Sequence, residues 1–164
     1  MSTGQTILTM GALILFSTLM ITMNASYQTS GDLVVQSELG ITASSLAISL
    51  IEEATAKAFD KSTDTAIAVS TSTLTQPENL GPENGEVYPH FNDFDDYNNI
   101  SLTQNVDKIG TYNLKANVVY VDFSSPDYPA TSPTWHKKLS VEVTNPDMID
   151  TVKMDYVFSY WYFR

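Results

Sequence analysis

The chain has 164 residues, a formal net charge of -11 and no cysteine. This length suits one domain with a hydrophobic core plus an extended element, and it excludes two large enzymatic domains. The sequence carries 8 Lys and Arg residues against 19 Asp and Glu residues. This balance argues against a nucleic acid partner, because phosphate backbones require clustered cations. The lack of cysteine excludes disulfides, zinc-thiolate sites and thiol catalysis.

The N-terminal segment contains no Asp, Glu, Lys or Arg before Asp32. Residues 7–23 are mostly apolar, and a helix over residues 5–26 would extend roughly 33 Å, which is enough to cross a bilayer. The segment suits a secretory signal, a permanent membrane anchor or a helix that later packs in an assembly. A secretory signal is disfavoured because no basic residue precedes the apolar run. The glycine and hydroxyl residues of the segment suit contact between helices as well as contact with lipid.

Helical periodicity continues beyond the apolar segment, from Asp32 to Asp60. Gly31 and Gly40 are expected to kink this helix. The sequence therefore predicts an N-terminal helix over residues 5–60, with a transmembrane part at 5–26 and an amphipathic part after it. A membrane anchor joined to an unrelated stalk is the alternative. The apolar residues of the amphipathic part fall on one stripe, which contains Val35, Leu39, Ala43, Leu46, Leu50, Ala54 and Ala58.

The second half of the chain has a different pattern. Turn-forming residues fill the segment 70–86, which predicts a long loop. Apolar residues then alternate with polar residues over three stretches, which predicts strands near 111–122, 136–144 and 151–163. The connection 145–150 contains Pro and Asp, as a tight turn between antiparallel strands requires.

These elements predict an α+β fold. A sheet with one apolar face needs a cover, and the amphipathic part of the helix supplies it. We expect a long N-terminal helix, transmembrane and then amphipathic, packed on a C-terminal antiparallel β-sheet. The globular domain should occupy residues 61–164.

This order of elements resembles the type IV pilin family, including the pseudopilins of type II secretion. The stretch "HFNDFDDYNNISLTQ" (90–104) is similar to the "FDDxDDYNG" stretch of minor pilin-like proteins. The stretch "HKKLSVEVTNPDMIDTVKMDYVFSYW" (136–161) is similar to the strands that close such domains. The resemblance implies a pilin-like fold and a structural subunit, without enzymatic activity, of a type IV pilus-like filament or a pseudopilus.

The resemblance also implies partners and a location. The partners would be identical or related pilin subunits, a prepilin peptidase and the inner-membrane assembly machinery. The protein would lie in the cell envelope, anchored in the membrane before assembly. After assembly it would form part of an extracellular filament or a periplasmic pseudopilus.

The start of the chain contains the residues that the resemblance assigns to processing. Residues 1–4 would form a leader peptide, cleaved between Gly4 and Gln5. Thr9 stands where the family has a glutamate that balances the amino terminus of a neighbouring subunit, and a hydroxyl group cannot supply that charge. Assembly should then depend on the small and hydroxyl residues of the apolar segment, which allow close helix packing: Thr9, Gly11, Ser17 and Thr18.

The stretch 93–98 contains a candidate metal site. Asp93, Asp95, Asp96 and Asn98 offer several oxygen ligands within a short loop, as Ca²⁺ requires. The spacing is not that of an EF-hand, and Asp and Asn are also common turn residues, so a purely structural turn is the favoured interpretation. Apart from this calcium hypothesis no cofactor is expected.

The remaining candidates favour structure over chemistry. His90 and His136 are the only histidines, lie far apart in sequence and have no constellation of Ser, Cys or Asp around either, so we expect no enzyme. The aromatic run 156–163 suits a core strand, and it also suits an adhesive face. The alternative function is therefore a membrane-anchored extracytoplasmic β domain that binds a glycan or a protein partner through this run or through the loop 124–134.

Overall fold

The computed structural model describes residues 2–160, and the chain divides into two compact units at Glu38 and Leu39. The first unit is the beginning of helix α1 (Thr3–Thr55). Nearly all of its side chains are exposed. Gly31 and Gly40, which were expected to kink the helix, lie inside it without ending it.

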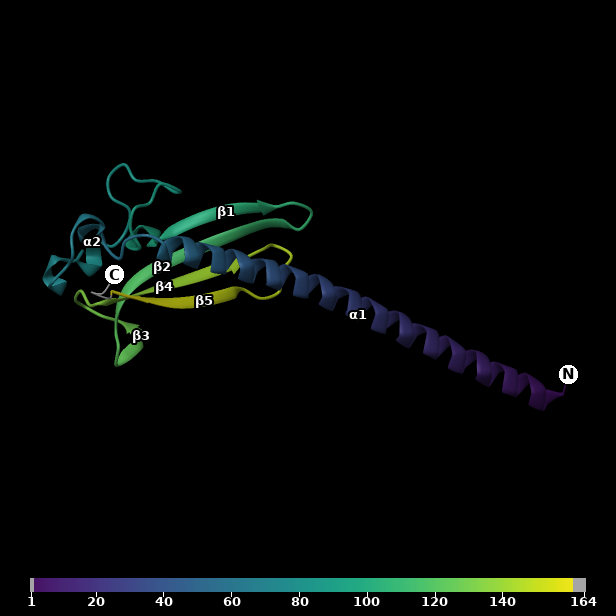
Figure 1. Ribbon diagram of the computed structural model, residues 1–164. Helices are drawn as coiled ribbons and strands as arrows, with labels where there is room; N and C mark the ends of the chain where they lie inside the picture. Colours follow the sequence, from purple (N-terminus) through teal and green to yellow (C-terminus); the bar gives the residue numbers. More distant parts are fainter. Residues whose placement is uncertain (1, 161–164) are drawn as a thin grey trace. The chain divides into compact units, whose positions relative to one another are not determined.

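The second unit contains a five-stranded antiparallel sheet (Figure 1). The strands pair in the order β1-β2-β4-β5, and β3 pairs with the end of β2. The predicted link between the last two long strands is confirmed, because β4 and β5 pair antiparallel from His136–Ser159 to Val143–Val152. The strands are β1 (Ile100–Val106), β2 (Gly110–Asp122), β3 (Ser125–Pro129), β4 (His136–Thr144) and β5 (Val152–Ser159).

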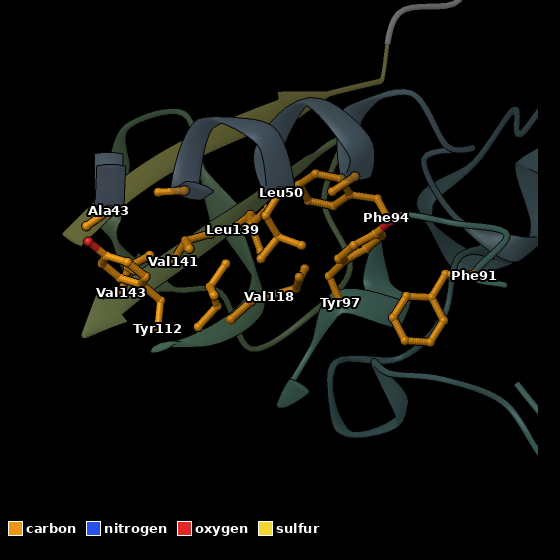
Figure 2. Close-up of a cluster of buried hydrophobic side chains, with 14 of the residues drawn as sticks. Ala43, Leu50, Phe91, Phe94, Tyr97, Tyr112, Val118, Leu139, Val141 and Val143 are labelled. Carbon is orange, nitrogen blue, oxygen red and sulfur yellow. The ribbon is translucent and has the colours of Figure 1, made fainter. Parts of the chain in front are cut away.

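The C-terminal part of α1 covers one face of this sheet, which confirms the α+β arrangement predicted from the sequence (Figure 2). Side chains of β2 and β4, among them Tyr112, Val118 and Val143, face the helix. Alanine at three positions of the helix lets its backbone approach the strands closely, because the methyl group is small. The buried helix residues are Leu39, Ala43, Ala47, Leu50 and Ala54.

The buried stripe differs from the predicted one in three places, and one of them is Ala58, which is only partly buried and lies beyond the end of α1. Ala47 is fully buried, whereas Leu46 is only partly buried at the margin of the core. Val35 is 52% exposed, because it precedes the part of α1 that packs on the sheet. The sequence predicted the helical period correctly. Which helix residues are buried also depends on where the sheet contacts the helix.

Helix α1 ends at Thr55, five residues before the predicted end. The main chain of Ala58 leaves the helical pattern and bonds instead to the segment 92–94, with Phe94 N donating to Ala58 O at 2.9 Å. Asp60 then starts a separate short helix, α2 (Lys61–Thr65), by accepting a hydrogen bond from Ser62 N. A tertiary backbone contact and a strong N-cap thus override the helical periodicity.

The remaining elements include strands that the sequence pattern did not predict. β1 is an edge strand whose outer positions are polar, and β3 lies in the segment 124–134, which was expected to be a loop. The predicted strand 151–163 is observed as β5 up to Ser159, and residues 161–163 lie outside the described residues. Three short 3₁₀ helices complete the unit: η1 (Thr71–Thr73), η2 (Pro77–Asn79) and η3 (Asp95–Tyr97).

A charge placed beneath α1 should unfold the second unit. Val143→Asp puts an unpaired carboxylate at a position with no exposed surface, and we expect a loss of about 3–5 kcal/mol in the free energy of unfolding. Val157→Asp is the matched control, because Val157 is 40% exposed on β5. Urea unfolding of the full chain in detergent micelles measures both variants. Equal midpoints for the two variants would contradict the observed packing.

Candidate functional sites: the apolar helix and the acidic loop

The first candidate site is the apolar part of α1. The hydroxyl groups of Thr9, Ser17 and Thr18 donate hydrogen bonds to main-chain carbonyl oxygens one turn earlier in the same helix, at 2.8–2.9 Å. A side chain added at Gly11 would meet no atom within 4 Å. The hydroxyl groups among the predicted assembly residues are therefore bonded within their own helix, and Gly11 adds a position without a side chain.

The same part of α1 exposes most of its large apolar side chains. It is the one helix of the described chain that is long and apolar enough to cross a membrane. The predicted processing residues Gly4 and Gln5 lie in its first turn and are exposed. The exposed apolar residues before Asp32 are Ile7, Leu8, Met10, Leu13, Ile14, Leu15, Phe16, Leu19, Met20, Ile21, Met23 and Tyr27.

The second candidate site is the segment 83–98, which we call the acidic loop. It contains the four residues predicted as calcium ligands. Asp93 Oδ1 accepts hydrogen bonds from the main-chain N–H groups of Asp95 and Asp96. Asn98 donates to Leu80 O at 2.8 Å, and its side-chain oxygen accepts from Val118 N at 2.9 Å. Asp93 and Asn98 thus hold the loop in shape, as the alternative turn interpretation expects.

Asp95 directs one carboxylate oxygen to a buried ammonium group. Lys137 Nζ donates to Asp60 Oδ2 at 2.9 Å, to Asp95 Oδ1 and to Phe59 O at 2.8 Å. The ammonium also lies 4.6 Å from the centre of the Phe59 ring and 5.2 Å from that of Tyr120. All three N–H bonds of the ammonium are used. We call Asp60, Asp95 and Lys137 the Lys137 cluster.

The Lys137 cluster shifts the pKa values of its carboxyl groups in different directions. Burial by itself would raise the pKa of Asp60, but the Lys137 ammonium outweighs burial and holds that pKa below its usual range. Burial raises the pKa of Asp95, although Lys137 opposes the shift. Burial and the neighbouring carboxylates of Asp95 and Asp96 raise the pKa of Asp93 to about 9. Asp93 therefore carries a proton at neutral pH, which limits the buried negative charge.

Asp96 is the one predicted ligand that meets other carboxylates in a possible metal-binding arrangement among the described residues. One carboxylate oxygen each from Glu83, Glu86 and Asp96 lie within 4.8 Å of one another. We call these residues the acidic triad. The four predicted ligands thus do not form one set. Sequence analysis missed Glu83 and Glu86, although Gly85 between them indicates a tight turn that brings them together.

The short distances between the carboxyl groups of the acidic triad affect their pKa values. A hydrogen bond shared with Glu83, together with burial, raises the pKa of Glu86 to about 7. Glu83 also forms an ion pair with Lys61, at 2.9 Å between Oε1 and Nζ. The neighbouring carboxyl group therefore favours the protonated form of Glu86.

The aromatic run predicted at 156–163 divides between core and surface. The Phe158 ring lies 5.0 Å from that of Phe94, and the Tyr160 ring stacks on Trp135 at 5.4 Å. Tyr156 is 43% exposed and borders a hollow of about 420 Å³ next to α2 and the end of β5. In the described part of the run, Phe158 and Tyr160 are therefore partly buried against the core, whereas Tyr156 and Val157 are exposed.

Comparison of the chain with protein-family models, with curated proteins and with solved structures finds no match.

Removal of the Lys137 ammonium should destabilise the second unit strongly. Lys137→Met leaves Asp60 and Asp95 buried without their cation, and we expect a loss of about 3–5 kcal/mol in urea unfolding of the full chain in detergent. Lys153→Met is the control, because it removes an ion pair with Glu142 whose lysine side chain is 66% exposed. That change should cost less than about 1 kcal/mol. A similar loss in both variants would contradict a special role of the Lys137 cluster.

Proposed function

We propose that the protein is a structural subunit that is held in a membrane by the apolar part of α1 and assembles through the same helix into a filament of the type IV pilus or pseudopilus kind. The observation that carries the proposal is the exposed apolar surface of residues 3–38 in a helix that continues into the core of the folded unit. Such a surface requires cover from lipid or from other apolar helices.

The hydroxyl groups that bond within the helix suit both proposed surroundings of the helix, the bilayer and the filament. Hydroxyls that bond to their own helix leave no unsatisfied donor in a bilayer, where an unpaired polar group is costly. They also leave the helix surface smooth enough for close packing against another helix. The segment can therefore exchange lipid contacts for helix contacts without breaking hydrogen bonds. Partners would be identical or related subunits.

The lack of charged residues before Asp32 suggests that neighbouring subunits would be held together by the packing of their apolar helices. The first acidic residue is Asp32, so the apolar part has no carboxylate to pair with the amino terminus of a neighbour. Cohesion between subunits should then be spread over many small contacts, because each hydroxyl hydrogen bond between apolar helices contributes only about 0.6–2 kcal/mol.

Gly11→Leu should impair assembly more than Thr9→Val. The leucine adds bulk where helices would approach, whereas valine keeps the shape of threonine and loses one hydroxyl, which bonds within its own helix. The measurement is filament yield sheared from the surface of the producing cells, normalised to the subunit retained in the membrane. We expect a several-fold loss for Gly11→Leu and little change for Thr9→Val. The reverse order would show a specific polar role of Thr9 and would contradict cohesion by packing.

Assembly in this manner also predicts the start of the mature chain. Cleavage after Gly4 would give an amino terminus at Gln5, at the beginning of the apolar helix. Mass spectrometry of the subunit from sheared filaments should identify Gln5 as the first residue. A chain that keeps Met1, or one that begins near Ser26 as after signal-peptide cleavage, would contradict this processing.

A second candidate function is a membrane-anchored domain that binds a glycan or a protein partner. The hollow beside Tyr156 favours it, because an exposed aromatic ring at a concave surface suits sugar binding. Under this function, Gly11→Leu would leave activity unchanged in cells that retain the subunit, and Tyr156→Ala would abolish binding to a glycan array. The filament assay and the array therefore separate the two functions.

A further inference from the structure

The acidic triad and the neighbouring Asn92 gather oxygen atoms from two turns of one loop. Glu86 N donates to Glu83 O at 3.0 Å, which closes a tight turn with Gly85 at φ +96°. A residue with a side chain is strained at this φ, so glycine lets the turn form and brings both glutamates to one side. We propose that the triad and the Asn92 side-chain oxygen bind a calcium ion.

The oxygen atoms without partners point to this ligand. Among residues 2–160, the buried side-chain nitrogen or oxygen atoms that lack a hydrogen bond are Glu83 Oε2, Asn92 Oδ1 and Asp96 Oδ1. All three are oxygens of the acidic loop, and two of them, Glu83 Oε2 and Asp96 Oδ1, belong to the triad. Buried acceptors without a partner are rare in folded proteins, and two in one triad suit a bound cation.

Asp96 is the most informative of these residues, because it has no exposed surface. Its Oδ2 atom accepts hydrogen bonds from the main-chain N–H groups of Asn92, at 2.9 Å, and Asp93, at 3.2 Å. These two bonds fix the orientation of the carboxylate. The other oxygen, Oδ1, is left free for a ligand at the centre of the loop.

Asn92 supplies a neutral ligand beside the triad. Its side-chain Nδ2 donates to Glu86 Oε1 at a distance shorter than a normal hydrogen bond. A half-turn of the amide exchanges its nitrogen and oxygen and points Oδ1 toward the carboxylates. Such an amide oxygen is a common calcium ligand.

The charge of the loop fits a divalent ion. The ammonium that contacts the triad is that of Lys61, whose side chain is 58% exposed. Three ionised carboxylates and one ammonium leave two negative charges, which one Ca²⁺ neutralises. The basic side chain lies at the solvent side of Glu83 and leaves the buried oxygens to the ion.

The kind of ligand set fits Ca²⁺ better than Mg²⁺. Ca²⁺ accepts about six to eight oxygen ligands in an irregular arrangement, whereas Mg²⁺ requires a nearly ideal octahedron and usually keeps several waters. Three carboxylates from one folded loop suit the more tolerant ion.

A bound ion would add to the contacts between two parts of the loop, such as the hydrogen bond from Asn92 to Glu86. Glu83 and Glu86 belong to the turn before Tyr88, whereas Asp96 belongs to η3, which Tyr97 ties to α1 through a 2.8 Å hydrogen bond to Glu53. The ion would thereby fasten the turn to the core of the second unit. Binding to the folded state alone raises the melting temperature.

The test uses the full chain in detergent micelles, freed of metal with a chelator and titrated with CaCl₂ or MgCl₂. We expect about 10 mM CaCl₂ to raise the melting temperature by about 4 °C or more, and MgCl₂ to raise it by less than half as much. Calorimetric titration should give a Kd of about 0.1–1 mM for Ca²⁺, as in other extracellular calcium modules.

Variants separate this site from general attraction of cations to an acidic protein. Glu83→Gln and Glu86→Gln should each weaken Ca²⁺ binding at least tenfold, whereas Glu78→Gln, an exposed carboxylate of the same segment, should bind like the unchanged chain. Asn92→Ala should also weaken Ca²⁺ binding, and it keeps the hydrogen bond from the main chain of residue 92 to Asp96. This variant tests the site if a glutamine variant fails to fold. No rise in melting temperature with CaCl₂, an equal rise with MgCl₂, or the same Ca²⁺ affinity in the site variants as in Glu78→Gln would overturn the proposal.

Discussion

The buried ammonium of Lys137 is the constraint on which the second unit depends. It joins the start of α2 through Asp60, the acidic loop through Asp95 and the strand β4 that carries Lys137. Asp60 further accepts hydrogen bonds from Thr75 N and from the Tyr120 hydroxyl. A charge without exposure to water must be paired and fully hydrogen-bonded. The cluster therefore fixes the relative position of five segments of the chain.

We expect the buried ion pairs of Lys137 to determine which arrangement the second unit adopts more than how stable that unit is. Apolar contacts beneath α1 supply the main driving force, and they would allow small slips of the helix along the sheet. A buried ion pair does not tolerate such slips, because any displacement leaves charges unpaired. In a domain without disulfides, the Lys137 cluster selects one arrangement of helix, loop and sheet from those that the apolar core permits. The acidic loop is held in place as a consequence.

Periodic segments could be predicted from the sequence, and segments shaped by tertiary contacts could not. Strand β4 was located to the residue, because its alternation reflects one buried and one half-buried face. The end of α1 was misplaced because Ala58 bonds to the loop, which no local pattern records. In the acidic loop, Asp93 and Asn98 accept hydrogen bonds from the main chain, whereas Glu83 and Glu86 reach Asp96 only through a turn at Gly85. The sequence indicated that carboxylates gather in this part of the chain, but the folding of the loop determined which of them meet.

The order of strands leaves β1 and β5 at the two edges of the sheet. An edge strand offers unpaired main-chain groups to other sheets, and exposed charges discourage such pairing. On β5, Lys153 and Asp155 are exposed, and on β1 the exposed positions are polar, including Ser101 and Thr103. Exposed charged or polar residues thus lie on both edge strands, although Tyr156 and Val157 of β5 are exposed as well. Charged side chains on an edge strand disfavour main-chain pairing between the sheets of neighbouring molecules, which would otherwise lead to amyloid-like stacking.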